Sequence, residues 1–282
     1  MLRRGHVLTV LVTLLVAGCS RSGGRGTAKA GAPGTNSTST AVSTTTSSTP
    51  TSSAKATSGR LAGKTILVDP GHNGGNASDP TFINKPVWNG RESEACDTAG
   101  AATRAGYAES TFNWNVAQLL KADLESQGAR VVLTRTSNTG VGPCITERAA
   151  IGNQARADAA VSVHADSGPA GGRGFAILEP VADRINDAII EPSKRLGSAL
   201  RTAFLAGTGM PISTYDGVNG VQPRDDLAGL NLSTVPKVFI ECGNMVNTTD
   251  AALLVSPAWQ QQAAHALAKG LTDFVEGPHI GG

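Results

Sequence analysis

The sequence predicts an α/β fold, a single domain with a mostly parallel, twisted sheet and helices on both faces. Five short apolar runs rich in β-branched residues have the composition of buried strands. They alternate with longer segments of helical periodicity. This alternation is typical of parallel sheets, in which each crossover connection places a helix over one face. The predicted strands cover residues 65–69, 130–134, 159–163, 175–179 and 237–241.

The predicted helices lie between these strands and after the last one. Residues 110–127 place apolar side chains, among them Phe112 and Leu124, on one helix face, and Gly128 follows as a stop signal. One connection, residues 73–108, is much longer than the others, and connections of this length are uncommon unless they are functional or disordered. Further helices are expected at about residues 146–157, 183–206 and 257–275.

The first residues have the layout of a secretory signal peptide. Arg3 and Arg4 precede a short apolar run that ends at small residues, and the run is too short to cross a bilayer as a stable helix. Its end, VAGC, resembles the lipobox of bacterial lipoproteins, in which the cysteine becomes the lipidated first residue after cleavage. We therefore predict a signal peptide over residues 1–18 and lipidation at Cys19. The alternative is that Cys19 lies within an ordinary cleavage region.

Residues 19–60 are almost entirely Ser, Thr, Gly, Ala and Pro, a composition that predicts a disordered tether. The folded domain is expected at residues 61–276, followed by a short tail at 277–282. A net charge of +2 is too small to indicate nucleic-acid binding, and much of the basic excess lies in the first sixty residues. The simplest expectation is an exported monomer that its lipid anchor holds at the outer face of the cytoplasmic membrane, or in the periplasm or cell wall.

The four cysteines have different expected roles. In an exported protein a pair of thiols is more often a disulfide than a metal site. Cys96 and Cys144 lie in polar, glycine-containing loops and form the predicted disulfide. Cys242 directly follows a predicted strand and is expected as a buried free thiol.

Two histidines follow predicted strands, at the sheet edge where ligands gather in open α/β folds. His72 comes three residues after the first strand, and His164 comes directly after the third. The other histidines are poorly placed for shared chemistry, because His6 leaves with the signal peptide, His265 lies in the last helix and His279 lies in the tail. Two histidines at one edge of one sheet indicate a metal site.

Two carboxylates complete this candidate site. A catalytic zinc commonly takes three protein ligands and leaves one position for water, and Glu109, where the first helix begins, can supply the third ligand. Glu241 ends the last strand and directs a further carboxylate at the same edge, where it can take the proton of an activated water. This constellation predicts a zinc hydrolase.

Each of these four residues also has a simpler interpretation. A histidine after Asp-Pro-Gly can be a turn residue bonded to the backbone, and one after a strand can be a satisfied core group. Glu109 can favour the helix dipole. Glu241 can pair with an arginine such as Arg224 or Arg135. From spacing alone, the metal site and the simpler interpretations are equally open.

Longer patterns are more specific. They are ILVDPGHNGG (66–75), the segment from YAES to LTR (107–135), the segment from ITER to HAD (145–166), and the segment from RDDL to AALL (224–254). In this order they resemble the zinc-dependent N-acetylmuramoyl-L-alanine amidases of the Amidase_3 family, especially the compact mycobacterial-type members that lack a separate wall-binding domain. The resemblance covers residues 64–275 and implies that His72, Glu109 and His164 are zinc ligands and that Glu241 is the catalytic glutamate.

The same resemblance implies Zn²⁺ as cofactor and peptidoglycan or muramoyl-peptide fragments as substrate, in cell-wall remodelling or recycling. The bond cut joins the lactyl carbonyl of N-acetylmuramic acid to the L-alanine nitrogen. Arg224 is expected to contact a stem-peptide carboxylate through its planar guanidinium, and a surface ion pair with Asp225 or Asp226 is equally open. The sequence departs from the family at Asn73, usually a glycine, and at CGNM (242–245). In some relatives a segment near 73–108 controls access to the zinc.

Two other functions remain open. A zinc peptidase or deacetylase acting on another envelope amide needs nearly the same catalytic residues, so only analysis of the products separates it from an amidase. A peptidoglycan-binding module with an occluded zinc is the non-enzymatic alternative, and the presence of Glu241 disfavours it. Serine hydrolysis is disfavoured because no G-x-S-x-G motif occurs.

Overall fold

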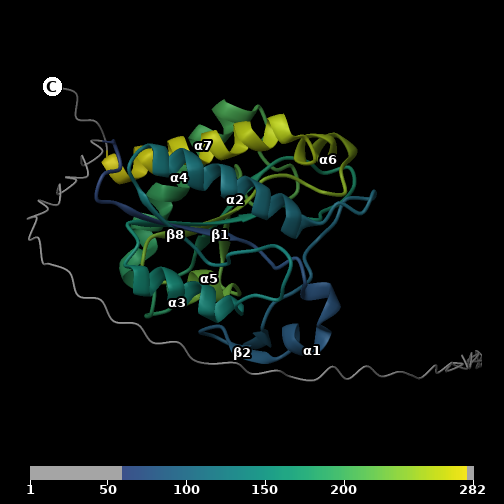
Figure 1. Cartoon of the computed structure of the whole chain (residues 1–282), viewed down its shortest axis with the longest axis horizontal. Coiled ribbons are helices and arrows are strands. Elements are labelled where there is room, and N and C mark those ends of the chain that lie inside the picture. The colour runs from purple at the N-terminus through teal and green to yellow at the C-terminus, as the bar shows by residue number, and fades with distance from the viewer. Residues whose placement is uncertain (1–58, 278–282) are drawn as a thin grey trace, which may run out of the picture. The chain divides into compact units, whose positions relative to one another are not determined.

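The computed structural model describes residues 59–277 and shows a six-stranded sheet with helices on both faces (Figure 1). The strand order is β4-β1-β5-β8-β6-β7, and β6 runs antiparallel to β8 while the other neighbouring pairs are parallel. The predicted α/β fold with a mostly parallel sheet is therefore confirmed. The strands of this sheet are β1 (Thr65–Pro70), β4 (Arg130–Leu133), β5 (Ala159–His164), β6 (Ala176–Pro180), β7 (Val221–Arg224) and β8 (Lys237–Glu241).

The helices cover the two faces in separate groups (Figure 1). Three long helices, α2 (Glu109–Ser126), α4 (Ile190–Thr208) and α7 (Pro257–Glu276), pack over one face with α6 (Thr248–Leu254) beside them. The short helix α5 (Ala228–Asn231) and α3 (Ile145–Ala155) cover the other face. The described part of the chain also contains α1 (Pro80–Ile83) and the 3₁₀ turns η1 (Asn76–Ser78) and η2 (Asp187–Ile189).

Alternation along the strands separates an apolar face from a face that carries polar residues. Val68, Val161 and Ile240 point to the three long helices and belong to the main core. Leu67 and Ala160 belong to a smaller core on the other face. Polar strand residues, among them Asp69, Ser162 and Glu241, therefore lie on the side of α3 and α5.

Two of the differences from the predictions concern the start of one helix and one edge strand of the sheet. The helix expected from residue 183 begins at Ile190, because Asp183 Oδ1 accepts hydrogen bonds from the backbone N–H groups of Ile185 and Asn186 and holds a turn there. The strand β7 was not predicted, since VQPR has one large apolar residue and a proline. Proline is tolerated in β7 because this strand lies at the edge of the sheet.

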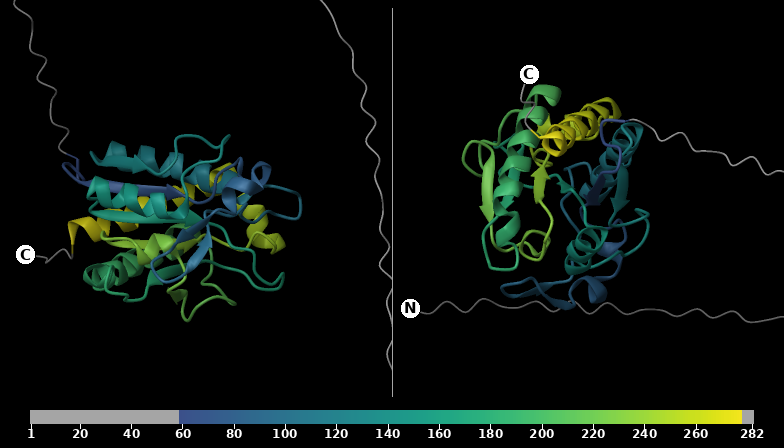
Figure 2. Two further views of the ribbon diagram at one scale, coloured as in Figure 1. Left: turned by 90° about the horizontal axis from the view of Figure 1, so that it is seen from below. Right: turned by 90° about the vertical axis from the view of Figure 1, so that its left-hand side faces the viewer.

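The long connection at residues 73–108 is structured. It contains η1, α1 and an antiparallel hairpin formed by β2 (Pro86–Trp88) and β3 (Ser93–Ala95). Figure 2 shows this hairpin on the same side of the sheet as α3. The predicted disulfide is present, with Cys96 after β3 bonded to Cys144 before α3. Cys242 is a buried free thiol, as expected.

Some predictions concern residues that the structure does not describe. The signal peptide, the lipidation site at Cys19 and the tether up to residue 58 lie outside the described range, as does the tail from residue 278. Within residues 59–277, no helix is long and apolar enough to cross a membrane.

Candidate metal centre

His72, Glu109 and His164 meet at the carboxyl edge of the sheet. His72 follows β1, Glu109 is the first residue of α2, and His164 is the last residue of β5. Each offers a ligand atom, and these atoms all lie within 4.8 Å of one another. Glu109 bridges the two histidines, with Oε2 at 3.2 Å from His72 Nε2 and Oε1 at 2.9 Å from His164 Nδ1. The structure therefore brings together the three residues that were predicted as ligands.

Two glycines allow this close approach. A Cβ atom on Gly71 would lie 2.1 Å from Cε1 of His164. Gly100 has φ +76, and a Cβ there would lie 2.7 Å from Cδ2 of His72 and 2.9 Å from Oε2 of Glu109. Distances below about 3 Å are not tolerated between a Cβ and another heavy atom, so larger residues at either position would displace the cluster.

Glu109 is buried and well satisfied. Its Oε2 accepts the backbone N–H of Ala101 at 2.7 Å, and its Oε1 accepts from Ala165 N at 3.2 Å and from Asn113 Nδ2 at 3.3 Å. Burial alone would raise the pKa of Glu109, but the adjacent His72 and His164 outweigh burial and hold this pKa well below its usual range. The carboxylate is therefore charged at neutral pH, as a metal ligand must be.

His72 lies between two carboxylates. Burial alone would lower the pKa of its imidazole, but the charges of Glu109 and Asp97 overcome burial and raise the pKa to about 10. Without a metal, the imidazole of His72 therefore carries a proton between the carboxylates of Glu109 and Asp97. Two imidazoles and one carboxylate form a donor set that suits zinc, so these residues fit the metal that the sequence implies.

Glu241 ends β8 and is paired in the sheet with His164. Its Oε2 is buried and has no hydrogen-bond partner among the described residues. Burial, followed by the charges of Glu109 and Asp166, raises the pKa of Glu241 well above its usual range. A carboxylate with a raised pKa beside a candidate metal cluster is suited to proton transfer.

The arginines proposed as alternative partners of Glu241 are engaged elsewhere. Arg135 donates to the backbone carbonyls of Pro70 and Ser110. Arg224 forms a two-pronged ion pair with Asp226, with both contacts at 2.6 Å. The structure therefore contains the surface ion pair that was the alternative to a substrate contact for Arg224.

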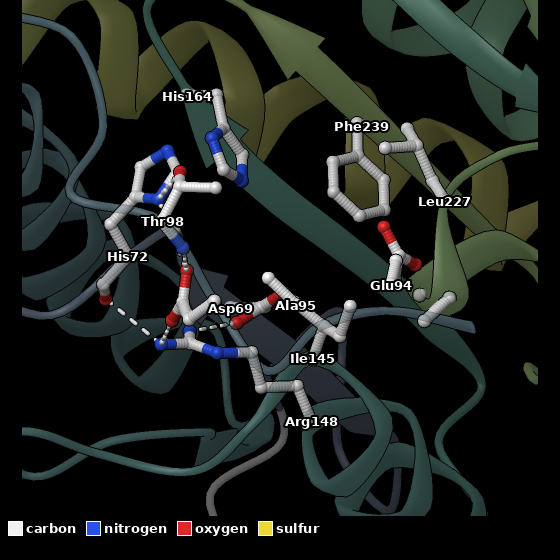
Figure 3. A pocket seen from close by; sticks show the side chains of 14 residues that line it. Asp69, His72, Glu94, Ala95, Thr98, Ile145, Arg148, His164, Leu227 and Phe239 are labelled. Carbon is white, nitrogen blue, oxygen red and sulfur yellow. Dashed lines mark hydrogen bonds and ion pairs between the residues drawn. The ribbon is translucent and has the colours of Figure 1, made fainter. Parts of the chain in front are cut away.

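A cavity of about 190 Å³ opens beside the two histidines (Figure 3). Ile145, Leu227 and Phe239 give it apolar walls, and the ring of Phe239 stacks on that of His164. The hairpin contributes Glu94, whose Oε1 is buried and has no hydrogen-bond partner within residues 59–277. The segment 73–108 therefore forms part of the wall of the cavity.

Sequence reasoning missed two polar residues at this cavity, Asp97 and Arg148. Asp97 lies 3.2 Å from Nδ1 of His72, and Arg148 donates to the backbone carbonyl of the same histidine. Asp97 directly follows Cys96, and this was a weak signal that it lies near the site. Arg148 lies near the start of a predicted helix, and its sequence neighbours gave no such signal.

The fold and this cluster define a single α/β domain with a His–Glu–His site suited to a metal ion. The sequence profile of the Amidase_3 family, described as N-acetylmuramoyl-L-alanine amidase, matches residues 66–273. The chain therefore belongs to the Amidase_3 family.

Individual relatives agree with this assignment. The chain is 40% identical over 223 residues to N-acetylmuramoyl-L-alanine amidase Rv3717 of Mycobacterium tuberculosis, which covers 79% of this chain and 90% of the relative. It superposes on the crystal structure of the N-acetylmuramyl-L-alanine amidase Ami1 from Mycobacterium smegmatis with a TM-score of 0.72 and 40% identity, covering 76% of this chain and 98% of that chain. The apo form of Ami1 from Mycobacterium abscessus gives a TM-score of 0.71 and 41% identity, covering 76% and 99%.

Proposed function

We propose that this protein is a zinc-dependent N-acetylmuramoyl-L-alanine amidase. It hydrolyses the amide bond between N-acetylmuramic acid and the L-alanine of peptidoglycan stem peptides, in cell-wall remodelling or recycling. Family membership supports the amidase activity. The observation that carries the zinc dependence is the convergence of His72, Glu109 and His164 within 4.8 Å, with Glu241 on the neighbouring strand.

In this proposal His72, Glu109 and His164 hold the metal. A zinc ion bound there supplies a Lewis acid for the scissile carbonyl and lowers the pKa of a water. A positive charge in the cluster would lower the raised pKa of Glu241, because it opposes the effects of burial and of Glu109.

Glu241 is the proposed general base and acid. Its carboxylate takes a proton from the attacking water and later delivers a proton to the L-alanine nitrogen as the amide C–N bond breaks. The buried, unpartnered Oε2 is available for this role, since no described residue competes for it. The apolar cavity walls beside His72 and His164 limit the access of bulk water on that side and offer a surface for the peptide.

Arg224 is proposed as a secondary contact for a carboxylate of the stem peptide. In the free protein its guanidinium is bound by Asp226, which raises the pKa of Arg224. A substrate carboxylate would therefore have to replace or join Asp226, and the contribution of such a partly exposed contact is small.

We further propose that residues 1–18 direct export and that Cys19 carries the lipid, so that a monomer acts at the cell envelope. Relatives described as cell wall amidases, from Bacillus anthracis and Staphylococcus epidermidis, support an envelope location. The described disulfide is consistent with an oxidising compartment.

The deciding experiment is mass spectrometry of the products formed from a defined muramoyl peptide. Residues 60–282 are loaded with zinc, and Glu241→Gln serves as the matched control. Release of a free L-alanine amino terminus that depends on zinc and on Glu241 is expected. Cleavage of a different amide would favour a peptidase or deacetylase. Bound zinc without any product would favour a binding module, or a cavity closed by the 73–108 segment.

A further inference from the structure

The backbone of His72 adopts an unusual conformation. Its φ is +55, in the left-handed region that residues other than glycine rarely occupy. Such a conformation costs about 1–2 kcal/mol for a residue with a side chain, so neighbouring groups must stabilise it. The turn that presents this candidate ligand is therefore held by contacts from other parts of the fold.

Arg148, in α3, supplies those contacts. Its side chain is only 4% exposed, and its guanidinium points at the end of β1 (Figure 3). Nη2 donates to the carbonyl of His72 at 2.9 Å, and Nη1 donates to the carbonyl of Pro70 at 2.9 Å and to Asp69 Oδ1 at 2.8 Å. One planar guanidinium thus holds both sides of the turn, a task for which the compact ammonium of lysine is poorly shaped.

The same guanidinium also reaches the imidazole of His72 through Asp97. Arg148 Nη2 lies 3.3 Å from Asp97 Oδ2, and Asp97 Oδ1 lies 3.2 Å from His72 Nδ1. The other ring nitrogen, Nε2, faces Glu109. When Nδ1–H donates to Asp97, Nε2 carries the lone pair that a metal needs, so Asp97 selects the tautomer suited to ligation.

A covalent bond joins the two supporting segments. Cys96 directly precedes Asp97, and Cys144 is the N-cap of α3, four residues before Arg148. The backbone adds a hydrogen bond of 2.8 Å from Ile145 N to the carbonyl of Cys96. The disulfide therefore lies beside the Asp97–Arg148 ion pair and restricts the separation of its two partners.

We propose that Asp97 and Arg148 are positioning residues of the metal centre, and that the Cys96–Cys144 disulfide holds them in register. They fix His72 at its backbone and at Nδ1, so that Nε2 meets a zinc ion without reorganisation. The inference rests on the metal site of the proposed function. It adds that zinc affinity depends on residues of the 73–108 segment and of α3 that are not ligands.

The test is the zinc affinity of the purified full-length protein, measured by competition with a chromophoric chelator. Removing a partner that orients a ligand weakens metal binding about 10–100-fold. This loss is expected for Asp97→Ala and Arg148→Lys. Asp97→Asn keeps an acceptor for Nδ1–H and is expected to lose less affinity than Asp97→Ala. The double variant Cys96→Ser/Cys144→Ser is expected to bind zinc more weakly than the wild type.

Arg173→Lys is the matched control, because Arg173 also binds a buried carboxylate, that of Asp250 at 3.0 Å, but does not contact His72 or Asp97. It is expected to keep the wild-type zinc affinity. Denaturant unfolding of each metal-free variant measures its stability separately, and Asp97→Asn remains informative if Arg148→Lys does not fold.

The outcomes distinguish this inference from the proposed function. Folded Asp97→Ala and Arg148→Lys proteins that bind zinc within twofold of the wild type would overturn the positioning role alone. A wild-type protein that binds no zinc would overturn both the positioning role and the metal site. Selective loss of affinity in the Asp97 and Arg148 variants, with Arg173→Lys unchanged, would support the inference.

Discussion

Replacing Glu241 with glutamine separates metal binding from proton transfer. The side chain keeps its shape but can no longer accept a proton at neutral pH. Glu241 is not a member of the His72–Glu109–His164 cluster, so zinc occupancy is expected to stay at the wild-type level. Hydrolysis is expected to fall, because the variant has no group at this position that takes the proton from water and returns it to the leaving nitrogen.

The size of the loss follows from the role. A positioned general acid or base contributes about 10²–10⁴-fold to a rate. This corresponds to about 3–5 kcal/mol of activation free energy, at about 1.36 kcal/mol for each factor of ten. Glu241 is proposed to act in both directions of proton transfer, and no other described group hydrogen-bonds to its Oε2. The upper part of the range is therefore expected.

Stability provides an independent readout. The pKa of Glu241 is raised in the folded, metal-free protein by burial and then by Glu109 and Asp166. A carboxyl whose folded pKa exceeds its unfolded pKa binds more protons when folded, so its contribution to stability decreases as pH rises above about 4.5. The metal-free Glu241→Gln variant lacks this decrease and is expected to be at least as stable as the wild type at neutral pH.

Three measurements on the same preparations test these expectations: product release by mass spectrometry, zinc content by elemental analysis, and denaturant unfolding with and without chelator. Undiminished turnover in Glu241→Gln would remove Glu241 as the base. Loss of zinc from the variant would instead assign Glu241 to the ligand set. A marked loss of stability would show that its carboxylate has a partner that the described contacts lack.

Three further predictions use the same methods. His164→Ala is expected to lower zinc occupancy, and a full metal complement would contradict its role as a ligand. Zinc binding at pH 7–8 is expected to release protons and to tighten as pH rises, because His72, whose metal-free pKa is about 10, must lose a proton to bind the metal. Calorimetry in buffers of different ionisation enthalpy measures this release, and its absence would contradict the assignment of His72 as a ligand. Arg224→Ala breaks a partly exposed ion pair with Asp226, so the free energy of unfolding should change by less than about 1 kcal/mol. If Arg224 contacts substrate, KM should rise with kcat nearly unchanged, whereas an unaltered KM would exclude the contact.

The candidate site was predictable because its parts lie where local sequence signals are strong. A β-branched run marks where each strand ends, and His72, His164 and Glu241 lie at or just beyond such ends. Parallel strands place those ends at one edge, so the positions of the residues along the chain predict that they meet. The resemblance to the family selected the metal site from the equally open alternatives.

The antiparallel direction of β6 and the pairing of the edge strand β7 were not predictable from local signals. The run 175–179 indicates a strand but carries no information about its direction, which the connections and neighbours decide. The 73–108 segment likewise shows little periodicity. Its hairpin is held by long-range contacts that local sequence does not reveal: Asn89 Nδ2, for example, donates to the carbonyl of Asp226, 137 residues away in sequence.

The sequence by itself determined the alternation of strands and helices, the residues at the strand ends and the cysteine pair, because these depend on local periodicity and residue type. Only the tertiary structure decided how His72 is supported. Its contacts come from Asp97 and Arg148, at sequence separations of 25 and 76 residues. These two residues become partners of His72 because α3 and the 73–108 segment pack against the end of β1. Residue type alone does not identify them, since other aspartate–arginine pairs in the chain, Arg173–Asp250 and Arg224–Asp226, form ion pairs without contacting His72.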